Sequence, residues 1–362
     1  MYGSYPGRRR MRAAARVRRA TAATAVLTAT VTGAALLLTG CSSGHDGGVD
    51  GGVDGRGEGR GDGGDGGRTP TQVSRPPRAE DPFWVNPDGS AARQVAAYTA
   101  KGDAENAELI RKIAEQPAGE WISPDTPQEQ AQGFTEAATE ADRDALLVLY
   151  NVPHRDCGQF SKGGAADGDA YRRWVDKVAR GIGDRRATVI LEPDAVLHLV
   201  DGCTPAEFHE ERYDLLKKAV QRLKKQPATT VYLDAGNPGW QSPDALFEPL
   251  QRAGIAEADG FSVNVSNFYP TDASTDFGKR LSAKVGGKPF VIDTSRNGND
   301  SNGEWCNPAG RRIGAVSQTG GGAEMLLWLK TPGESDGNCG VGAGSVAGQF
   351  LPEVAYKMVY GY

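Results

Sequence analysis

Short apolar runs recur between residues 119 and 330, separated by longer polar stretches. In Val189-Ile190-Leu191 three apolar residues stand together, which is typical of a strand buried on both faces of a parallel sheet. Pro193 cannot donate a ladder hydrogen bond, so we expect the chain to leave this strand at Asp194. About seven strands are predicted, at residues 119–123, 145–150, 188–193, 230–235, 260–265, 289–293 and 324–330.

Helical patterns alternate with these strands. Residues 169–183 and 210–226 have apolar positions at helical spacing and basic residues near their carboxyl ends. Strands that alternate with helices form a parallel sheet. The segment 80–362 is also close to the usual length of a barrel domain, about 250 residues. The pattern predicts a distorted (β/α) barrel of about seven parallel strands, although an open sheet would show the same periodicity.

The amino-terminal segment has the layout of a secretory signal peptide. Seven arginines precede an apolar run over residues 20–38, and the run ends in Leu38-Thr39-Gly40-Cys41. This ending looks like a bacterial lipobox, which implies removal of residues 1–40 and lipid attachment at Cys41. We therefore expect an exported lipoprotein on the outer face of the cell membrane, also released in part. An ordinary signal peptide or an uncleaved anchor are the alternatives.

Residues 41–79 are dominated by Gly, Asp and Arg and contain almost no large apolar side chain. Such a segment cannot bury enough surface to fold, so it is predicted to be a disordered linker to a domain at 80–362. The whole chain has a net charge of -5. Since the seven arginines of the signal would be removed, the mature chain is more acidic still. The sequence has no basic patch that would indicate a nucleic-acid partner, and none is expected.

Four cysteines follow Cys41. An even number in an exported domain favours two disulfides, for which three pairings are possible. The sequence-local pairing, Cys157–Cys203 with Cys306–Cys339, is preferred. A zinc site is the competing interpretation, but no two cysteines are close in sequence and the chain has only 4 His. We expect no metal and no other cofactor.

Acidic residues end or follow several predicted strands. Because the carboxyl ends of parallel strands meet at one edge, where α/β enzymes place their chemistry, these acids are candidate catalytic groups. For Asp194 the alternative is a capping role for the helix that begins in AVLHLV. The acids in question are Asp156, Asp194, Asp234, Asp293, Glu334 and Asp336.

Aromatic residues are interleaved with these acids. Flat rings beside hydrogen-bonding carboxylates suit a sugar chain, because pyranose faces stack on aromatics and hydroxyls bond to polar groups. Any one of these rings could instead belong to the core. Trp240 and Trp305 lie in turn-rich loops, which favours a binding role for them. The full set is Trp121, Tyr150, Trp240, Trp305 and Trp328.

Two longer motifs carry a family resemblance. Residues 148–164, VLYNVPHRDCGQFSKGG, and residues 189–199, VILEPDAVLHL, closely resemble the two signature motifs of glycoside hydrolase family 6. This family comprises cellulases and cellobiohydrolases that cleave β-1,4-glucan with inversion. The resemblance continues through most of the chain, at residues 81–87, 232–240, 260–268, 290–300, 304–314 and 327–340.

The resemblance implies a role for each matching residue. Asp194 would be the general acid, and Asp156 would raise its proton affinity and help to position the water. Asp336 matches the residue proposed as general base, with a water relay as the alternative. Arg155 and Arg296 would orient and neutralise the carboxylates. Substrate contacts are implied for Trp121, Tyr150, Asp234, Asn237, Trp240, Asn264, Trp305, Lys330 and Glu334.

Some positions depart from the family pattern. Asn237 stands where a histidine is common, Lys162 where a small residue is expected, and His198 follows the acid motif in an unusual context. These departures leave the preferred glucan open. The segments after Cys203 and Cys339 are short, which favours an open cleft and an endoglucanase over a cellobiohydrolase. A monomer is expected, and a surface glucan-binding lipoprotein with little or no catalysis is the remaining alternative.

Overall fold

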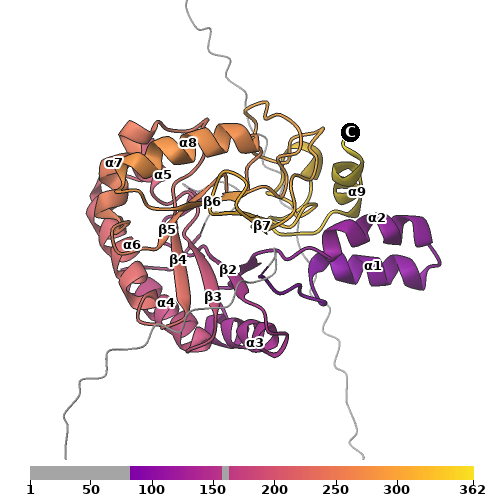
Figure 1. Ribbon diagram of the computed structural model, residues 1–362, viewed down its shortest axis with the longest axis horizontal. Coiled ribbons are helices and arrows are strands. Elements are labelled where there is room, and N and C mark those ends of the chain that lie inside the picture. Colours follow the sequence, from indigo (N-terminus) through magenta and orange to yellow (C-terminus); the bar gives the residue numbers. More distant parts are fainter. Residues whose placement is uncertain (1–81, 157–162) are drawn as a thin grey trace, which may run out of the picture. The chain divides into compact units, whose positions relative to one another are not determined.

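The computed structural model describes residues 82–156 and 163–362, and its centre is a curled sheet of eight strands in the order β1-β2-β3-β4-β5-β6-β8-β7 (Figure 1). All neighbouring pairs are parallel except β7 with β8. The strands are β1 (Glu120–Trp121), β2 (Ala145–Leu149), β3 (Ala187–Leu191), β4 (Thr229–Asp234), β5 (Gly260–Val263), β6 (Phe290–Asp293), β7 (Gln318–Thr319) and β8 (Met325–Leu327). Each of the seven predicted runs overlaps a strand, so the parallel α/β fold is confirmed.

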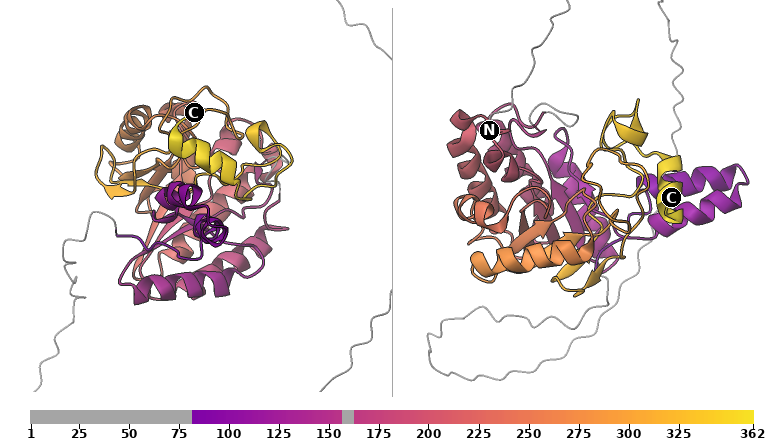
Figure 2. Two further views of the ribbon diagram at one scale, coloured as in Figure 1. Left: turned by 90° about the vertical axis from the view of Figure 1, so that its right-hand side faces the viewer. Right: turned by 90° about the horizontal axis from the view of Figure 1, so that it is seen from above.

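The helices of the described residues are α1 (Ser90–Ala100), α2 (Ala104–Ala114), α3 (Pro127–Glu140), α4 (Gly168–Ile182), α5 (Leu197–Val200), α6 (His209–Leu223), α7 (Pro243–Arg252), α8 (Thr271–Lys284) and α9 (Pro352–Tyr360), with short 3₁₀ turns η2 (Ala206–Phe208) and η3 (Gly340–Gly342). Helices α3, α4, α6, α7 and α8 cover the outer face of this sheet, while α1, α2 and α9 lie beside it (Figures 1 and 2). The two helices predicted at 169–183 and 210–226 are α4 and α6. Helices α1 and α2 form a hairpin beside the sheet, and α2 packs on α9.

Strands β2 to β6 are buried on both faces, as their apolar runs predict. Leu147 and Leu149 of β2 face the helices, and they belong to a large core cluster with residues of α4 and α6. The alternate residues Leu146 and Val148 face the inside of the curl and pack with Tyr232 of β4. This alternation follows from the two-residue period of a strand. Burial on both faces fixes the strand ends, and therefore the loops that leave them.

The curl brings β1 close to the chain that follows β8. The backbone nitrogen of Gly119 donates to the carbonyl of Trp328 at 2.9 Å, and the Trp121 indole donates to the Leu329 carbonyl at 2.8 Å. A Cβ at Gly119 would lie 2.8 Å from the Leu329 oxygen, so only glycine allows this approach. Within residues 82–156 and 163–362 no β-ladder joins β1 to β8, and the barrel stays open along this seam.

The strand β7 was absent from the prediction. It pairs antiparallel with β8 and has only two residues, so β7 is too short for an apolar pattern to predict it. Several predictions lie outside the described residues: the signal at 1–40, the linker at 41–79, and the individual residues Cys41, Cys157 and Lys162. In the part of the chain that the structure describes, no helix is long and apolar enough to cross a membrane.

Candidate active site

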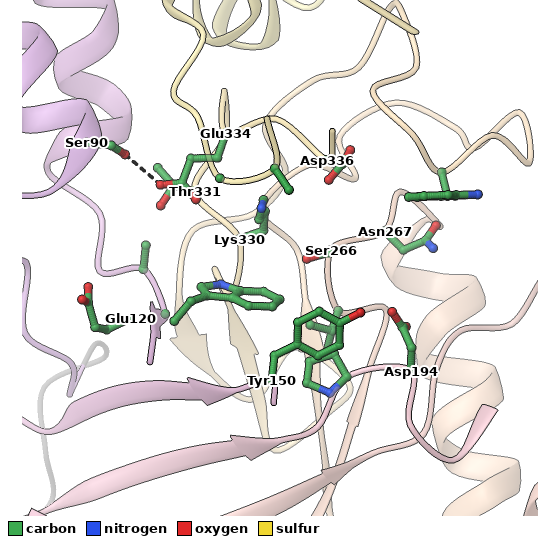
Figure 3. Close-up of a pocket in the computed structure, with 18 of the residues that line it drawn as sticks. Ser90, Glu120, Tyr150, Asp194, Ser266, Asn267, Lys330, Thr331, Glu334 and Asp336 are labelled. Carbon is green, nitrogen blue, oxygen red and sulfur yellow. Dashed lines mark hydrogen bonds between the residues drawn. The ribbon is translucent and has the colours of Figure 1, made fainter. Parts of the chain in front are cut away.

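A cavity of about 1060 Å³ opens at the carboxyl ends of the strands, and the start of α1 lines one end of it (Figure 3). Eleven of the predicted site residues line this cavity together, although they come from loops far apart in the sequence. They are Trp121, Tyr150, Arg155, Asp156, Asp194, Asn237, Trp240, Trp305, Lys330, Glu334 and Asp336. Asp234, Asn264 and Arg296 are instead buried around it.

Asp194 lies just beyond β3 and points into the cavity (Figure 3). Its backbone has a φ of 68°, a left-handed conformation that is strained for a residue other than glycine. Burial raises the pKa of Asp194 well above its usual range, and the charges of Asp234, Asp156 and Asp201 raise it further. A carboxyl group in this environment holds its proton near neutral pH, as a general acid requires.

The helix-capping alternative for Asp194 is wrong. Helix α5 begins at Leu197 and has no side-chain cap hydrogen bond. The contact between Asp194 and this helix is a backbone bond, in which the His198 nitrogen donates to the Asp194 carbonyl at 3.0 Å. The carboxyl group itself is therefore directed to the cavity and available for chemistry.

Asp234 is fully buried at the end of β4 and does not line the cavity. Its carboxylate accepts hydrogen bonds from the Asp194 nitrogen at 3.0 Å, the Gly236 nitrogen at 3.1 Å and the Ser262 hydroxyl at 2.9 Å. Burial raises the pKa of Asp234 to about 6, and these donors partly offset that effect. The predicted substrate contact does not fit this position; Asp234 holds the backbone of the acid instead.

Asn264 is also buried, at the end of β5, and its amide is used within the protein. It donates to the carbonyls of Tyr269 and Asp293 and accepts from the Tyr269 nitrogen. No part of Asn264 lines the cavity. Its predicted substrate contact is therefore replaced by a structural role in the loop after β5.

Asp156 lies on the loop after β2, lines the cavity, and has a φ of 56°. Its charge is one cause of the raised pKa of Asp194. Burial, together with the charges of Asp194 and Asp156, holds the pKa of the Tyr150 phenol well above its usual range. Arg155 lies 4.6 Å from the Tyr150 ring centroid and donates to the Tyr150 carbonyl. Tyr150 is thus a neutral hydrogen-bonding group beside the two aspartates.

Asp336 lies in the segment that follows β8 and lines the cavity across from Asp194 (Figure 3). Its two carboxylate oxygens accept from one guanidinium nitrogen of Arg296 at 3.0 and 3.1 Å, and one of them accepts from the Asn307 nitrogen at 3.0 Å. Arg296 is itself buried, 4.4 Å from the Phe268 ring centroid, and donates to the Ser266 carbonyl. The predicted neutralising role of Arg296 thus has a direct geometric basis.

A disulfide joins Cys306 to Cys339 and confirms one of the two predicted pairs. It lies next to Trp305 and Asn307 on one side and three residues beyond Asp336 on the other. Cys203 is disulfide-bonded as well, while its predicted partner Cys157 lies outside the described residues. Among residues 82–156 and 163–362, no group of three or more His, Cys, Asp or Glu side chains could hold a metal ion.

Three tryptophans line the cavity at different points. Trp121 meets Tyr150 edge-on at 5.7 Å and has the Lys330 ammonium 5.3 Å from its ring centroid. Trp240 donates through its indole nitrogen to Asp201 at 3.0 Å. Trp305 is 41% exposed. Trp328, by contrast, is buried and donates to the Ala315 carbonyl, so it belongs to the core.

One end of the cavity is acidic. Glu334 accepts a hydrogen bond of 2.9 Å from Ser90 at the start of α1. Nearby, burial raises the pKa of Glu120, a hydrogen bond from Gln130 lowers it, and the Glu334 charge raises it again (Figure 3). Glu120 and Ser90 were not predicted, because neither follows a buried apolar run. Asp201, which orients Trp240, was missed because it follows a short helix rather than a strand.

The family model described as "Glycosyl hydrolases family 6" matches residues 78–360. The chain belongs to this family. A similar protein is "Endoglucanase 1" of Streptomyces halstedii, which is 49% identical over 302 residues, covering 81% of this chain and 93% of the relative. "Endoglucanase A" of Cellulomonas fimi is 41% identical over 78% of this chain, which spans only 62% of that longer relative.

A solved structure agrees with this membership. The endoglucanase Cel6 of Mycobacterium tuberculosis, solved in complex with methyl-cellobiosyl-4-deoxy-4-thio-β-D-cellobioside, has a TM-score of 0.72 and 39% sequence identity. The similarity covers 78% of this chain and 98% of that chain. The family 6 architecture is thus common to both proteins.

Proposed function

We propose that this protein is an endo-acting cellulase that hydrolyses internal β-1,4-glucosidic bonds with inversion. The observation that carries the proposal is the Asp194 carboxyl group, which lies in the cavity with a raised pKa and two further aspartates around it. Endoglucanases are among the relatives at 41% to 49% identity, which supports internal cleavage. No cofactor takes part in this chemistry.

The leaving group is protonated by Asp194. As the bond between the anomeric carbon and the glycosidic oxygen breaks, the proton of Asp194 passes to that oxygen and Asp194 becomes charged. Burial, together with the charges of Asp234 and Asp156, keeps the proton on Asp194 until this step. Tyr150 is a neutral donor or acceptor beside the sugar being cleaved.

A water attacks the opposite face of the anomeric carbon and loses its proton to a base. Asp336 is our candidate, because its carboxylate enters the cavity and is held by Arg296. A water chain that ends at Asp156 is the alternative route. Inverting enzymes generally keep acid and base about 6.5–9.5 Å apart, which leaves room for this water.

The glucan chain is bound by aromatic faces and polar side chains along the cavity. Trp121, Trp240 and Trp305 supply rings on which pyranose faces stack. Lys330 and Glu334 bond to hydroxyls at one end, and Asn237 does so near Trp240. An amide at Asn237 offers both a donor and an acceptor, so it replaces the family's usual histidine with a different hydrogen-bond pattern.

The test is hydrolysis of carboxymethylcellulose by a purified 80–362 fragment, with Asp194→Asn and Asp194→Ala as matched variants. We expect reducing ends from the unmodified domain and essentially none from the variants. A faster loss of viscosity than gain of reducing ends would establish internal cleavage, and the reverse would favour a cellobiohydrolase. Binding to β-1,4-glucan without any hydrolysis would overturn the enzyme proposal in favour of a binding lipoprotein.

We also propose that the protein is a lipid-anchored monomer with a second disulfide between Cys157 and Cys203. The support is the sequence: an arginine-rich apolar leader ends at Cys41, and a Gly-rich linker separates it from the domain. Mass spectrometry of the mature amino terminus tests lipidation, with Cys41→Ser as the control. Recovery of the entire protein from the culture fluid would contradict anchoring.

A further inference from the structure

The loops that carry Asp156 and Asp194 share an unusual backbone feature. Four of their non-glycine residues have left-handed backbones: His154 at 58°, Asp156 at 56°, Glu192 at 50° and Asp194 at 68°. Side chains of L-residues are crowded in this region, so such conformations persist only where surrounding contacts hold them. The contacts that hold these two loops therefore decide where the two aspartates lie.

One of these contacts comes from Glu192, which is completely buried at the end of β3. Its carboxylate accepts from the Asn151 nitrogen at 3.0 and 2.9 Å and from the Val152 nitrogen at 2.9 Å. Asn151 and Val152 begin the loop that leads to Asp156. The side chain two residues before Asp194 thus fixes the start of the loop that carries Asp156.

A second contact comes from Arg212, on α6. Its guanidinium donates to the Pro153 carbonyl at 2.8 Å, the His154 carbonyl at 3.0 Å and the Ala195 carbonyl at 3.3 Å. The first two acceptors precede Asp156, and the third directly follows Asp194. Arg212 is only 2% exposed, so its charge faces protein groups rather than solvent. One side chain therefore ties the two catalytic loops together.

We propose that Arg212, assisted by Glu192, is a positioning residue that fixes the distance between Asp156 and Asp194 and so keeps the proton on the acid. The inference rests on the proposed function, because it assigns Asp194 as the acid. Arg212 does not line the cavity, and its hydrogen bonds are to backbone carbonyls of the two loops rather than to the carboxyl groups of Asp156 or Asp194. Lysine cannot replace it fully, since a single ammonium group cannot span three carbonyls as a planar guanidinium does.

A purely structural role would have a different consequence. Loss of a buried arginine lowers stability in either case. A positioning role lowers the proton affinity of Asp194 when Arg212 is lost, because separation from Asp156 weakens the like-charge repulsion that keeps the proton on. Loss of the guanidinium charge by itself would raise that proton affinity instead. The two roles are therefore distinguished by the pH dependence of catalysis rather than by stability.

The test compares Arg212→Gln and Arg212→Lys with Arg222→Gln as the control. Arg222 lies on the same helix, and its guanidinium pairs with Asp176 of α4 at 2.7 Å, outside the cavity lining. For Arg212→Gln we expect kcat on a soluble cello-oligosaccharide to fall roughly 10- to 100-fold with little change in KM. The alkaline limb of the kcat/KM profile should move down by about one pH unit. Arg212→Lys should show a smaller shift, and Arg222→Gln none.

An unchanged alkaline limb in folded Arg212→Gln, or an equal shift in Arg222→Gln, would overturn the inference. If Arg212→Gln does not fold, the alkaline limb is measured for Arg212→Lys and Glu192→Gln instead, and a shift to lower pH is expected in both. The Asp194 carboxyl can also be titrated directly by ¹³C NMR, with Asp194→Asn identifying its signal. This titration needs no turnover, so an inactive unmodified protein would refute the proposed function while leaving the positioning role open to measurement.

Discussion

The backbone nitrogen of Asp194 donates a hydrogen bond of 3.0 Å to the Oδ2 of Asp234. The two aspartates lie at the ends of the neighbouring strands β3 and β4, which pair in parallel register. Asp234 therefore acts on the acid in two ways. It fixes the backbone of Asp194 through this bond, and its negative charge adds to burial in raising the pKa of the Asp194 carboxyl.

Asp234→Asn should move the alkaline limb of the kcat/KM profile to lower pH. The substitution removes a negative charge, so the pKa of Asp194 falls and its proton is lost earlier as the pH rises. The measurement is the pH dependence of cello-oligosaccharide hydrolysis. Asp293→Asn is the matched control, because Asp293 is an equally buried strand-end acid that bonds the Ser266 and Ser295 nitrogens. An equal shift in both variants would contradict the assignment.

The sequence predicted the strand-end acids as a group but could not separate their roles. Asp194, Asp234 and Asp293 all follow buried apolar runs, and from the sequence they are equivalent. In the structure, Asp234 and Asp293 turn inward because the neighbouring loops offer backbone N–H groups to them. Asp194 reaches the cavity instead. Which of these acids faces the cavity depends on contacts between neighbouring strands and loops, and the sequence pattern of a single strand does not predict such contacts.

The fold was predictable to a similar depth. Seven strands and two helices were predicted from apolar spacing, because most of them bury a full face against the core. The open seam between β1 and β8 was not, since it depends on the approach of Gly119 to Leu329 rather than on any periodic pattern. Trp328 shows the same limit: its ring is buried by residues that no local motif identifies.

Trp305→Ala should weaken substrate binding more than it affects stability. The ring lines the cavity and is 41% exposed, so the folded state loses little packing. Loss of a stacking face should cost about 1–2 kcal/mol of binding, or roughly 10-fold in KM on long cello-oligosaccharides. Trp305→Phe is the control that keeps an aromatic face. A large fall in kcat at unchanged KM would argue that Trp305 acts on the reaction and not on binding.

Replacing Cys306 and Cys339 together by serine should destabilise the domain. The bridge spans 33 residues, and closing a loop of this length contributes about 3–4 kcal/mol by the chain-entropy account. Guanidinium unfolding, compared with the unmodified domain, measures the difference. Activity should fall as well, because Asn307 beside the bridge bonds both the carboxylate and the backbone of Asp336. A stability loss below about 1 kcal/mol would show that neighbouring contacts already hold this loop.

His198 should make the stability of the domain fall as the pH drops below about 6.5. Burial lowers the pKa of His198 to about 4, although the Asp201 charge opposes this effect. In the unfolded chain this imidazole binds a proton near pH 6.5, whereas in the folded state it binds one only near pH 4. The contribution of His198 to stability is therefore full above pH 6.5 and is lost as the pH falls from 6.5 to about 4.

His198→Gln isolates this contribution, which amounts to about 3 kcal/mol at most. The raised pKa values of Glu192 and Asp234 act in the opposite sense, giving stability at low pH that is lost as the pH rises, but they are common to both proteins and cancel in the difference. We expect the free energy of unfolding of the unmodified domain, relative to the variant, to decrease between pH 7 and pH 4. His154→Gln, which removes an exposed ring, is the control. A difference that stays constant across this range would mean that His198 accepts its proton without cost to the fold.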